Sequence, residues 1–359
     1  WFGNIKIKIM QKNKNIFLKK KILIYGLGKS GLSTLNFLKS KSELYLYDDN
    51  KNNTKNPKHK KKIIEYNNLI RSKFDHIIIS PGIDINTCRL SNFIKKNLDK
   101  LNTDIDIFYS IYNKNKNITI TGSNGKSTTA KILYEVLKDQ KFDVRLVGNI
   151  GKPILSEKKI NKKTLFVIEA SSYQLEYSKI FKSNFAAILN ISPDHLERHK
   201  TLQNYIRAKF KLIKNQQYSD TAFLNIKDKY LKKEIKRNQI KSKIINVESK
   251  IESKILQEIN NPYFLTDSNI ENLSFIIKIS KKLKLNQNKL IKTLKKFKGL
   301  DYRQQIIYKS KNLTIINDSK ATSYSSSVSL LKSLTNVYWI VGGIPKLGDR
   351  FLLPKKLCN

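Results

Sequence analysis

The chain has 359 residues, of which 40% are hydrophobic, so it is long enough for two or three domains with buried cores. Lysine and arginine together number 70 against 28 aspartates and glutamates, a formal net charge of +42. No apolar run is long enough to cross a bilayer, and Cys88 and Cys358 lie too far apart to suggest a disulfide framework or a zinc site. These totals argue against a membrane-spanning protein and a disulfide-rich secreted domain, and they favour a protein of the reducing cytoplasm.

The positive charge has two interpretations. One is a nucleic-acid-binding ATPase, because basic proteins attract phosphate backbones. The other is a general bias of composition, since the lysines are spread along the whole chain and arginine, the better reader of bases, is scarce. We favour the second interpretation and expect no nucleic-acid partner, although the charge should attract polyanionic small substrates.

The two ends of the sequence predict a fragment. Trp1 cannot be an initiator, and Met10 lies just before the first predicted strand. Residues 300–359 are also fewer than a domain usually needs, so we expect a shortened third domain.

The first part of the chain predicts an open parallel sheet. The expected strands are Lys21–Tyr25, Leu44–Tyr47 and His76–Ile79. A helix is expected to follow the first strand and to run through Leu38, and the lysine-rich stretch 51–62 is expected to be a loop. In such sheets the ligand crevice lies at the carboxyl ends of the strands.

A second α/β unit is expected from about Asn117. Its predicted strands are Thr119–Thr121, Leu165–Ile168, Ala186–Leu189 and Ala222–Leu224, and its predicted helices include 203–213, 270–283 and 287–297. The stretch 227–259 is too low in complexity for a prediction. A hinge at KGLDYRQQ leads to a third unit with predicted strands Thr314–Ile316 and Val337–Val341, so the expected domains are 1–112, 113–299 and 300–359.

A glycine motif, GLGKSG, follows the first strand at residues 26–31, and Asp48 lies about twenty residues further on. This layout is typical of a dinucleotide site and suggests a nicotinamide oxidoreductase. The physical reason is more general, because glycines and a helix N-terminus accommodate any nucleotide diphosphate. The motif alone leaves both ligands open.

A second glycine motif, TGSNGKST, lies between a predicted strand and a predicted helix at residues 121–128. Lys126 can reach terminal phosphates, and Ser127 or Thr128 can offer a hydroxyl to Mg²⁺. Only Ser123 and Asn124 separate Gly122 from the Gly-Lys pair, which is shorter than the usual phosphate loop. The alternative is a glycine turn with a solvated lysine, and we favour the phosphate site.

Polar residues follow several other predicted strands. Glu169 is placed either to hold Mg²⁺ or to cap a helix, and Asp194 and His195 end another strand of the same sheet. Asp318 and Lys320 follow a strand of the third unit and could grip a charged substrate. Lys209 lies on the apolar face of a predicted helix, where the sequence alone favours a lysine that extends its ammonium to solvent.

Together these pieces resemble the Mur ligases, the ATP-dependent amide ligases of peptidoglycan synthesis. In that family the shortened loop Gly-[ST]-x-Gly-Lys-[ST] is the ATP site. SPGI at 80–83, EASSYQLE, DHLERH and NDSKAT look like the branch of the family that adds D-glutamate. The resemblance runs from about Lys20 to the end of the chain. The sequence departs from it in a shorter stretch between Leu224 and Ser268 and in a third domain without its distal part.

The resemblance implies a three-domain α/β architecture: a Rossmann-like N-terminal domain that binds a UDP-sugar, a central P-loop ATPase-type domain and a partial Rossmann-like C-terminal domain. The residues implied for the UDP-sugar are Ser30, Asp48, Asp49, Ser80, Pro81, Gly82, Asn149 and Gln174. Those implied for ATP are Gly122, Ser123, Asn124, Gly125, Lys126, Ser127, Thr128, Asn272, Arg303 and Asp318. D-Glutamate would meet Lys320, Thr322 and Lys346.

The resemblance also implies two Mg²⁺ sites, with Ser127 and Glu169 at one and His195 with a carbamylated Lys209 at the other. Lys126, His195 and Lys209 would be the catalytic residues. The expected reaction joins D-glutamate to UDP-N-acetylmuramoyl-L-alanine through an acyl phosphate, and the alternative is a Mur-type ligase for another amino acid. A cytoplasmic monomer with small-molecule substrates is expected.

Overall fold

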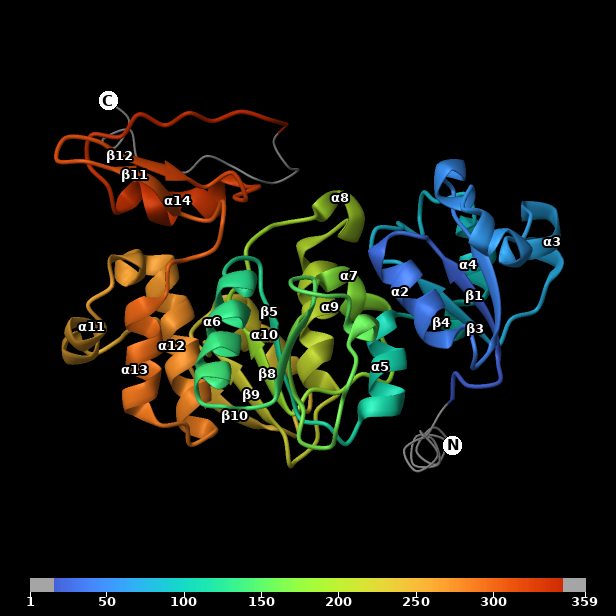
Figure 1. Ribbon diagram of the computed structural model, residues 1–359, viewed down its shortest axis with the longest axis horizontal. Coiled ribbons are helices and arrows are strands. Elements are labelled where there is room, and N and C mark those ends of the chain that lie inside the picture. The colour runs from blue at the N-terminus through green and yellow to red at the C-terminus, as the bar shows by residue number, and fades with distance from the viewer. Residues whose placement is uncertain (1–15, 345–359) are drawn as a thin grey trace. The chain divides into compact units, whose positions relative to one another are not determined.

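The computed structural model describes residues 16–344, and within them the chain forms two compact units (Figure 1). The first unit takes in described residues up to 116 together with 147–164 and 170–182, and the second takes in 117–146, 165–169 and the described residues from 183 on. The expected α/β class with parallel sheets is confirmed. The division into three domains at residues 112 and 299 stays a prediction.

The first unit is built on a four-stranded parallel sheet in the order β2-β1-β3-β4. Its strands are β1 (Lys21–Tyr25), β2 (Glu43–Tyr47), β3 (His76–Ile79) and β4 (Leu101–Asn102). Strand β1 lies in the middle because Ile22–Tyr25 is a fully buried apolar run, which suits a strand with neighbours on both edges and packing on both faces. The three strands expected here are confirmed, and β4 was not expected.

The first unit also contains helices and short 3₁₀ turns. They are α2 (Lys29–Leu38), η1 (Lys51–Thr54), η2 (Pro57–Lys62), α3 (Tyr66–Arg71), α4 (Ser91–Lys96), η3 (Leu98–Lys100), α5 (Asp104–Tyr112), η4 (Ile154–Ser156) and α7 (Ser172–Tyr177). The stretch 51–62, expected to be a loop, therefore consists largely of two 3₁₀ turns, whose first residues are capped by Asn50 and Asn56. The turn η4 packs on α2 and α5, which ties residues 147–164 to this unit.

The second unit contains a six-stranded sheet in the order β10-β9-β8-β5-β7-β6. Its strands are β5 (Asn117–Thr121), β6 (Val144–Gly148), β7 (Leu165–Glu169), β8 (Phe185–Ile188), β9 (Thr221–Leu224) and β10 (Lys243–Asn246). Strand β5 pairs in parallel with β7 on one side and with β8 on the other. The loops that follow these three strands therefore leave the sheet at the same edge.

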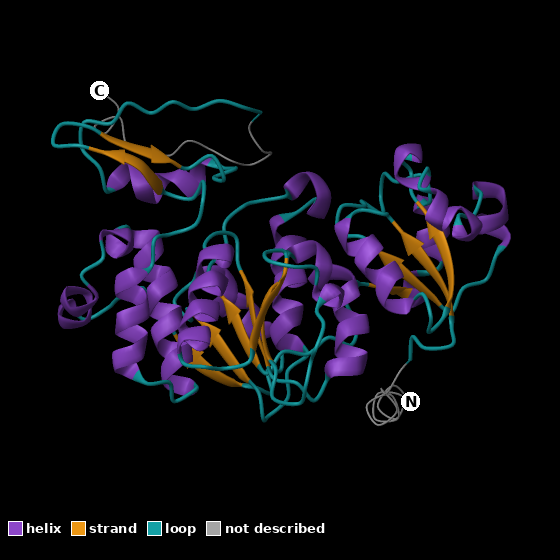
Figure 2. Ribbon diagram, viewed as in Figure 1, coloured by secondary structure: helices purple, strands orange, loops and turns teal. Residues whose placement is uncertain are grey.

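Helices flank both faces of this sheet (Figure 2). They are α6 (Lys126–Asp139), α8 (Leu196–His199), α9 (Leu202–Lys214), α10 (Lys229–Arg237), α11 (Ser253–Ile259), η5 (Pro262–Leu265), α12 (Asp267–Lys282) and α13 (Gln287–Lys296). Helices α12 and α13 pack on α6, and α9 packs on α10. The three predicted helices correspond to α9, α12 and α13, and 227–259, left without a prediction, contains α10, β10 and α11.

The last described segment holds a two-stranded antiparallel sheet of β11 (Gln305–Lys309) and β12 (Thr314–Asn317), followed by α14 (Tyr324–Lys332), which contacts α12. The expected strand at Val337–Val341 is wrong, because those residues form no strand and pair with no sheet. Tyr338 and Ile340 are 99% exposed. An apolar, β-branched run becomes a strand only where a neighbouring strand accepts its hydrogen bonds, and none does so here within the described residues.

A buried carboxylate ties α5 to the segment after α7 within the first unit. Asp106 is fully buried, and its Oδ1 accepts hydrogen bonds from the main-chain N–H groups of three consecutive residues, Lys179, Ile180 and Phe181, at 3.0–3.1 Å. The same oxygen accepts from the hydroxyl of Ser178 at 2.8 Å, and Oδ2 accepts from the N–H of Thr103. The carboxylate thus satisfies several donors at once, and those of Thr103, Ser178 and Phe181 would otherwise be buried without this partner.

We expect Asp106→Ala to lower the free energy of unfolding by about 3 kcal/mol or more, because several buried N–H groups lose a charged acceptor at once. Urea denaturation followed by circular dichroism measures the change. Asp99→Ala is the matched control, since Asp99 is exposed, and it should change stability by less than about 0.5 kcal/mol. Equal stability of the two variants would show that the segment is held by other contacts.

Candidate active site

The glycine loop between β5 and α6 has a backbone that only glycine tolerates at two positions. Gly122 has φ +153° and Gly125 has φ +80°, which is the left-handed region. A Cβ on Gly125 would lie 2.0 Å from Oδ1 of Asn272, a buried residue of α12. Asn272 of α12 therefore lies directly against the glycine loop at Gly125.

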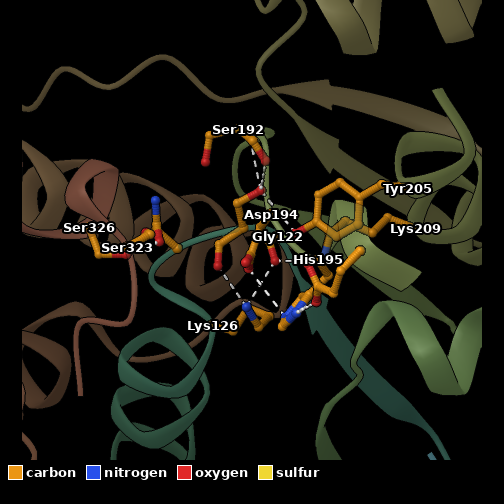
Figure 3. A network of polar contacts seen from close by, with 12 residues as sticks. Gly122, Lys126, Ser192, Asp194, His195, Tyr205, Lys209, Ser323 and Ser326 are labelled. Atoms are coloured by element: carbon orange, nitrogen blue, oxygen red, sulfur yellow. Dashed lines mark hydrogen bonds and ion pairs between the residues drawn. The ribbon is translucent and has the colours of Figure 1, made fainter. Parts of the chain in front are cut away.

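Two lysine side chains converge on one carbonyl of this loop (Figure 3). Lys126 Nζ donates to the carbonyl oxygens of Gly122 at 2.9 Å and Ser123 at 2.7 Å, while Lys209 Nζ donates to the Gly122 oxygen at 2.7 Å. Lys209 is 1% exposed, so the expectation that its ammonium extends to solvent is wrong.

The surroundings of Lys209 favour its neutral amine. Burial, and next the positive charge of Lys126, hold the pKa of Lys209 well below its usual value, and the carboxylates of Asp194 and Glu169 oppose this only in part. Its Nζ also lies 4.5 Å from the centre of the Tyr205 ring. A buried neutral amine is a nucleophile, and it is the form of lysine that reacts with CO₂.

Acidic and imidazole groups lie around the two lysines. Glu169, at the end of β7, is 1% exposed and pairs in register with Ile120 of β5. His195 precedes α8 with φ +56°, and its Nε2 lies 3.3 Å from Asp194 Oδ2. Buried His199 lies close by, and burial, helped by Arg198, lowers its pKa to about 4. Lys126 and His195 follow β5 and β8, and Glu169 ends β7, while Lys209 comes from the middle of α9.

The side chains beside the loop include oxygen donors of the kind that Mg²⁺ prefers. Within residues 16–344 no three His, Cys, Asp or Glu side chains form a ready metal cluster. Mg²⁺ nevertheless prefers few protein ligands, chiefly oxygens, and takes the rest from phosphate and water. The hydroxyl of Ser127 at the start of α6 and the carboxylate of Glu169 are oxygen donors of this kind. They fit a metal that arrives with a nucleotide.

Residues of the last segment reach the loop as well. Arg303 Nη2 donates to Ser127 Oγ at 3.1 Å, and Ser326 Oγ of α14 donates to Asn124 Oδ1 at 2.8 Å. Asp318 accepts a hydrogen bond from the N–H of Gln304 at 3.0 Å, and burial raises its pKa. Lys320 and Thr322 are exposed, and Lys346 lies outside the described residues.

The first unit holds the other glycine loop, after β1. Gly26 has φ +93°, and a Cβ there would lie 2.7 Å from Cβ of Ser80, whose hydroxyl donates to the Gly26 oxygen at 2.8 Å. Asp48 accepts from the N–H of Leu27 at 2.6 Å, and Asp49 accepts from the hydroxyl of Tyr25 at 2.7 Å. Asp48 and Ser80 thus hold the loop in place through hydrogen bonds to its main chain.

The remaining residues predicted for the UDP-sugar lie in the same unit. Pro81 and Gly82 form the turn after β3, and Asn149 is exposed after β6. Gln174 is 3% exposed, with Nε2 donating to Asp104 Oδ1 at 3.2 Å and Oε1 accepting from the N–H of Ser171. Asp104 also has a side-chain hydrogen bond with Ser30, and burial raises its pKa. The side chain of Gln174 is therefore buried and hydrogen-bonded within this unit, to Asp104 and Ser171.

Sequence reasoning missed several residues that hold the ATP-type loop. Asn190, just after β8, accepts from the N–H of Asn124 at 2.8 Å, and Tyr205 lies with its hydroxyl 3.1 Å from Ser123 Oγ. Glu271 of α12 accepts from Asn190. The position of Asn190 at a strand end was a usable signal. The helix residues carried none, because their role depends on packing between distant segments.

Each of the two units contains a stretch that matches a known domain family. Residues 20–101 match the Mur ligase MurD-like N-terminal domain, and residues 120–290 match the Mur ligase middle domain. In the described part of the chain, no helix combines the length and apolar character needed to cross a membrane. The chain belongs to the Mur ligase family, which confirms the resemblance drawn from its motifs.

Within that family the chain is similar to the UDP-N-acetylmuramoylalanine–D-glutamate ligases. It is 34% identical to the enzyme of that name from Rickettsia prowazekii, covering 93% of this chain and 79% of the relative. It is 33% identical to that of Francisella tularensis subsp. novicida, covering 94% and 77%.

Solved structures show the same fold. The UDP-N-acetylmuramate:L-alanyl-gamma-D-glutamyl-meso-diaminopimelate ligase of Neisseria meningitides has a TM-score of 0.51 at 14% identity, over 79% of this chain and 99% of that chain. MurF of Acinetobacter baumannii has a TM-score of 0.50 at 17% identity, over 64% and 57%. At these identities the likeness concerns architecture, and it confirms the expected Mur ligase fold.

We expect Gly125→Ala to weaken MgATP binding at least about tenfold, because the new Cβ would displace Asn272 and strain the left-handed backbone. Titration calorimetry measures the affinity. Gly342→Ala is the control, since a Cβ there meets nothing within 4 Å, and it should bind as the unmodified chain does. Undiminished binding by Gly125→Ala would mean that the loop changes conformation when it takes the nucleotide.

Proposed function

We propose that this chain is an ATP-dependent acid–amino-acid ligase that joins D-glutamate to UDP-N-acetylmuramoyl-L-alanine during the synthesis of peptidoglycan precursors. The observation that carries the proposal is the pair of lysines, Lys126 and Lys209, on the carbonyl of the shortened glycine loop. Its support in similarity is the group of relatives named UDP-N-acetylmuramoylalanine–D-glutamate ligase. In this proposal the bond formed is a peptide bond, and the enzyme is a cytoplasmic monomer.

ATP binds in this proposal at Gly122–Thr128, with Asn272, Arg303 and Asp318 toward the nucleoside. Lys126 leaves the two loop carbonyls that it contacts and turns to the terminal phosphates, where its charge compensates the charge that develops during transfer. The N-terminus of α6 adds main-chain N–H donors and a favourable dipole. The muramoyl-alanine carboxylate attacks the γ-phosphate, and the amine of D-glutamate then displaces phosphate from the acyl phosphate.

Mg²⁺ is proposed at two positions, one held by Ser127 and Glu169 and the other by His195 and Lys209. Bound there, the metal would neutralise negative charge on the phosphates. We propose that Lys209 is carbamylated, because its amine is buried and its pKa is held well below the usual value by that burial and by Lys126, which favours the neutral form that reacts with CO₂. The carbamate would turn a lysine that cannot bind a cation into an anionic oxygen donor.

The UDP-sugar is proposed to bind the first unit, where Ser30, Asp48, Asp49 and 80–82 surround the diphosphate and uridine, and Asn149 and Gln174 face the muramoyl part. The hydrogen bonds of Asp48 and Ser80 to the glycine loop support this, because they hold its main chain in a form that a diphosphate can approach closely. D-Glutamate is proposed to contact Lys320, Thr322 and Lys346: the positive charges of the two lysines suit its carboxylates, and the hydroxyl of Thr322 can hydrogen-bond to them.

Phosphate release tests the reaction and its amino acid. We expect the chain, given MgATP and UDP-N-acetylmuramoyl-L-alanine, to release phosphate faster when D-glutamate is added and to be unaffected by L-glutamate, L-lysine or diaminopimelate. Mass spectrometry of the product identifies the new peptide bond. Acceleration by a different amino acid would favour the alternative of a Mur-type ligase with another specificity.

Lys126→Ala and Glu169→Ala are each expected to lower kcat at least about 100-fold while the fold stays intact, since the first removes the positive charge proposed to face the transferred phosphate and the second removes the carboxylate proposed to hold Mg²⁺ there. Steady-state rates and circular dichroism measure the two effects. Lys138→Ala, on the exposed side of the same helix as Lys126, is the control and should keep its rate. Near-normal turnover in either site variant would remove the ATP-site assignment.

Lys209→Ala is expected to lose activity, and a short carboxylate such as formate in the buffer should restore part of it by replacing the carbamate oxygens. Assays over a range of formate concentration measure the recovery. Lys214→Ala is the control, because Lys214 lies on the exposed side of the same helix. Full activity of Lys209→Ala without formate would contradict a role in the site.

A further inference from the structure

Asn190 holds the main chain of the ATP-type loop on several sides. Its Oδ1 accepts from the N–H of Asn124 at 2.8 Å, and its Nδ2 donates to the Asn124 oxygen at 3.4 Å. Its own main-chain oxygen accepts from the N–H of Ser123 at 3.0 Å. One residue therefore fixes three consecutive peptide units, from Gly122–Ser123 to Asn124–Gly125, of the loop that would receive the phosphates.

The orientation of the Asn190 amide depends on Glu271. Nδ2 of Asn190 donates to Glu271 Oε2 at 2.8 Å. The two ends of an amide have nearly the same shape, and an ionised carboxylate can only accept hydrogen bonds. A flipped amide would place oxygen against oxygen at Glu271 and a donor against the N–H of Asn124. The carboxylate thus selects the orientation in which Oδ1 accepts from the loop.

Glu271 lies on α12, directly before Asn272, the residue that packs against Gly125. Burial, more than any other influence, raises its pKa to about 7, the charge of Asp228 at the start of α10 acts in the same direction, and hydrogen bonds from Asn190 and Ser249 oppose it. A protonated carboxyl can donate as well as accept. It then no longer distinguishes the two orientations of Asn190.

We propose that Glu271 is a positioning residue for ATP: through the amide of Asn190 it holds Asn124 and the glycine loop in the geometry that accepts the phosphates. This inference deepens the proposed function and rests on it. Above neutral pH the ionised Glu271 fixes the loop, and as the pH falls through about 7 the carboxyl gains a proton and the loop relaxes. The affinity for ATP accordingly declines toward acid pH.

Glu271→Gln tests the inference, because glutamine keeps the shape and, like the protonated acid, both donates and accepts. Titration calorimetry with MgATP between pH 6 and pH 8.5 should show an affinity that rises with pH in the unmodified chain and a flat, about tenfold weaker affinity in the variant. In the ligation assay KM for ATP should rise, with kcat and KM for the UDP-sugar within about twofold. Glu258→Gln, exposed on α11, is the control and should keep the pH dependence.

A double variant separates positioning from simple loss of packing. In Asn190→Asp with Glu271→Gln the polarity of the pair is reversed, so the new aspartate accepts from both the N–H of Asn124 and the amide of the new glutamine. We expect it to recover most of the ATP affinity that Glu271→Gln loses. Unchanged ATP affinity and pH profile in Glu271→Gln, or no recovery in the double variant, would overturn the inference. If the unmodified chain binds MgATP but joins no D-glutamate, the proposed ligation fails while the calorimetric result still decides the role of Glu271.

Discussion

The site is organised by one carbonyl group, that of Gly122, which accepts hydrogen bonds from the amines of both Lys126 and Lys209. Two ammonium groups on the same acceptor repel each other strongly when one is buried, because a low dielectric screens little of their charge. Lys126 is only partly buried, whereas Lys209 is buried, and this burial together with the charge of Lys126 holds the pKa of Lys209 well below its usual value. Two lysines on one carbonyl thus differ in chemical character, because the surroundings of the buried one favour its neutral amine.

This arrangement depends on the parallel sheet. Strands β7, β5 and β8 are neighbours and end at the same edge, so Glu169, the glycine loop and Asn190 leave the sheet side by side. Helix α9 then brings Lys209 and Tyr205 to this edge from one direction, while α12 brings Glu271 and Asn272 from another. Glycine at 122 and 125 lets these groups approach the main chain closely, which a side chain on the loop would prevent.

The sequence predicted those parts whose signal is local. Continuous apolar, β-branched runs predicted β1, β3 and β7. The glycine motif pointed to Lys126, and positions after predicted strands pointed to Glu169 and His195, because in a parallel sheet the strand ends form the ligand edge. Strands β4, β6 and β11 were missed and β10 lay in the stretch left without a prediction: β4 has only two residues, Arg145 interrupts β6, and β10 and β11 have apolar runs of two or three residues between polar ends. Val337–Val341 has a strand-like composition but lacks a strand to pair with. Glu271 and the burial of Lys209 depend on helix packing, which no local pattern records.

The composition makes the position of Lys209 more informative than that of any other lysine. A chain with 70 basic residues has lysine nearly everywhere, yet in residues 16–344 Lys209 is the only lysine that is buried. The buried acids are more numerous, Asp104, Asp106, Glu169, Asp220 and Glu234, although the chain has only 28 acidic residues in all. A compositional bias toward lysine is accommodated at the surface, where the ammonium stays hydrated, and is resisted in the interior, where removing its charge from water costs several kcal/mol or shifts the pKa. Lys209 occupies an interior position at the carbonyl that Lys126 also contacts, so chemistry at this site, rather than composition, accounts for a lysine there.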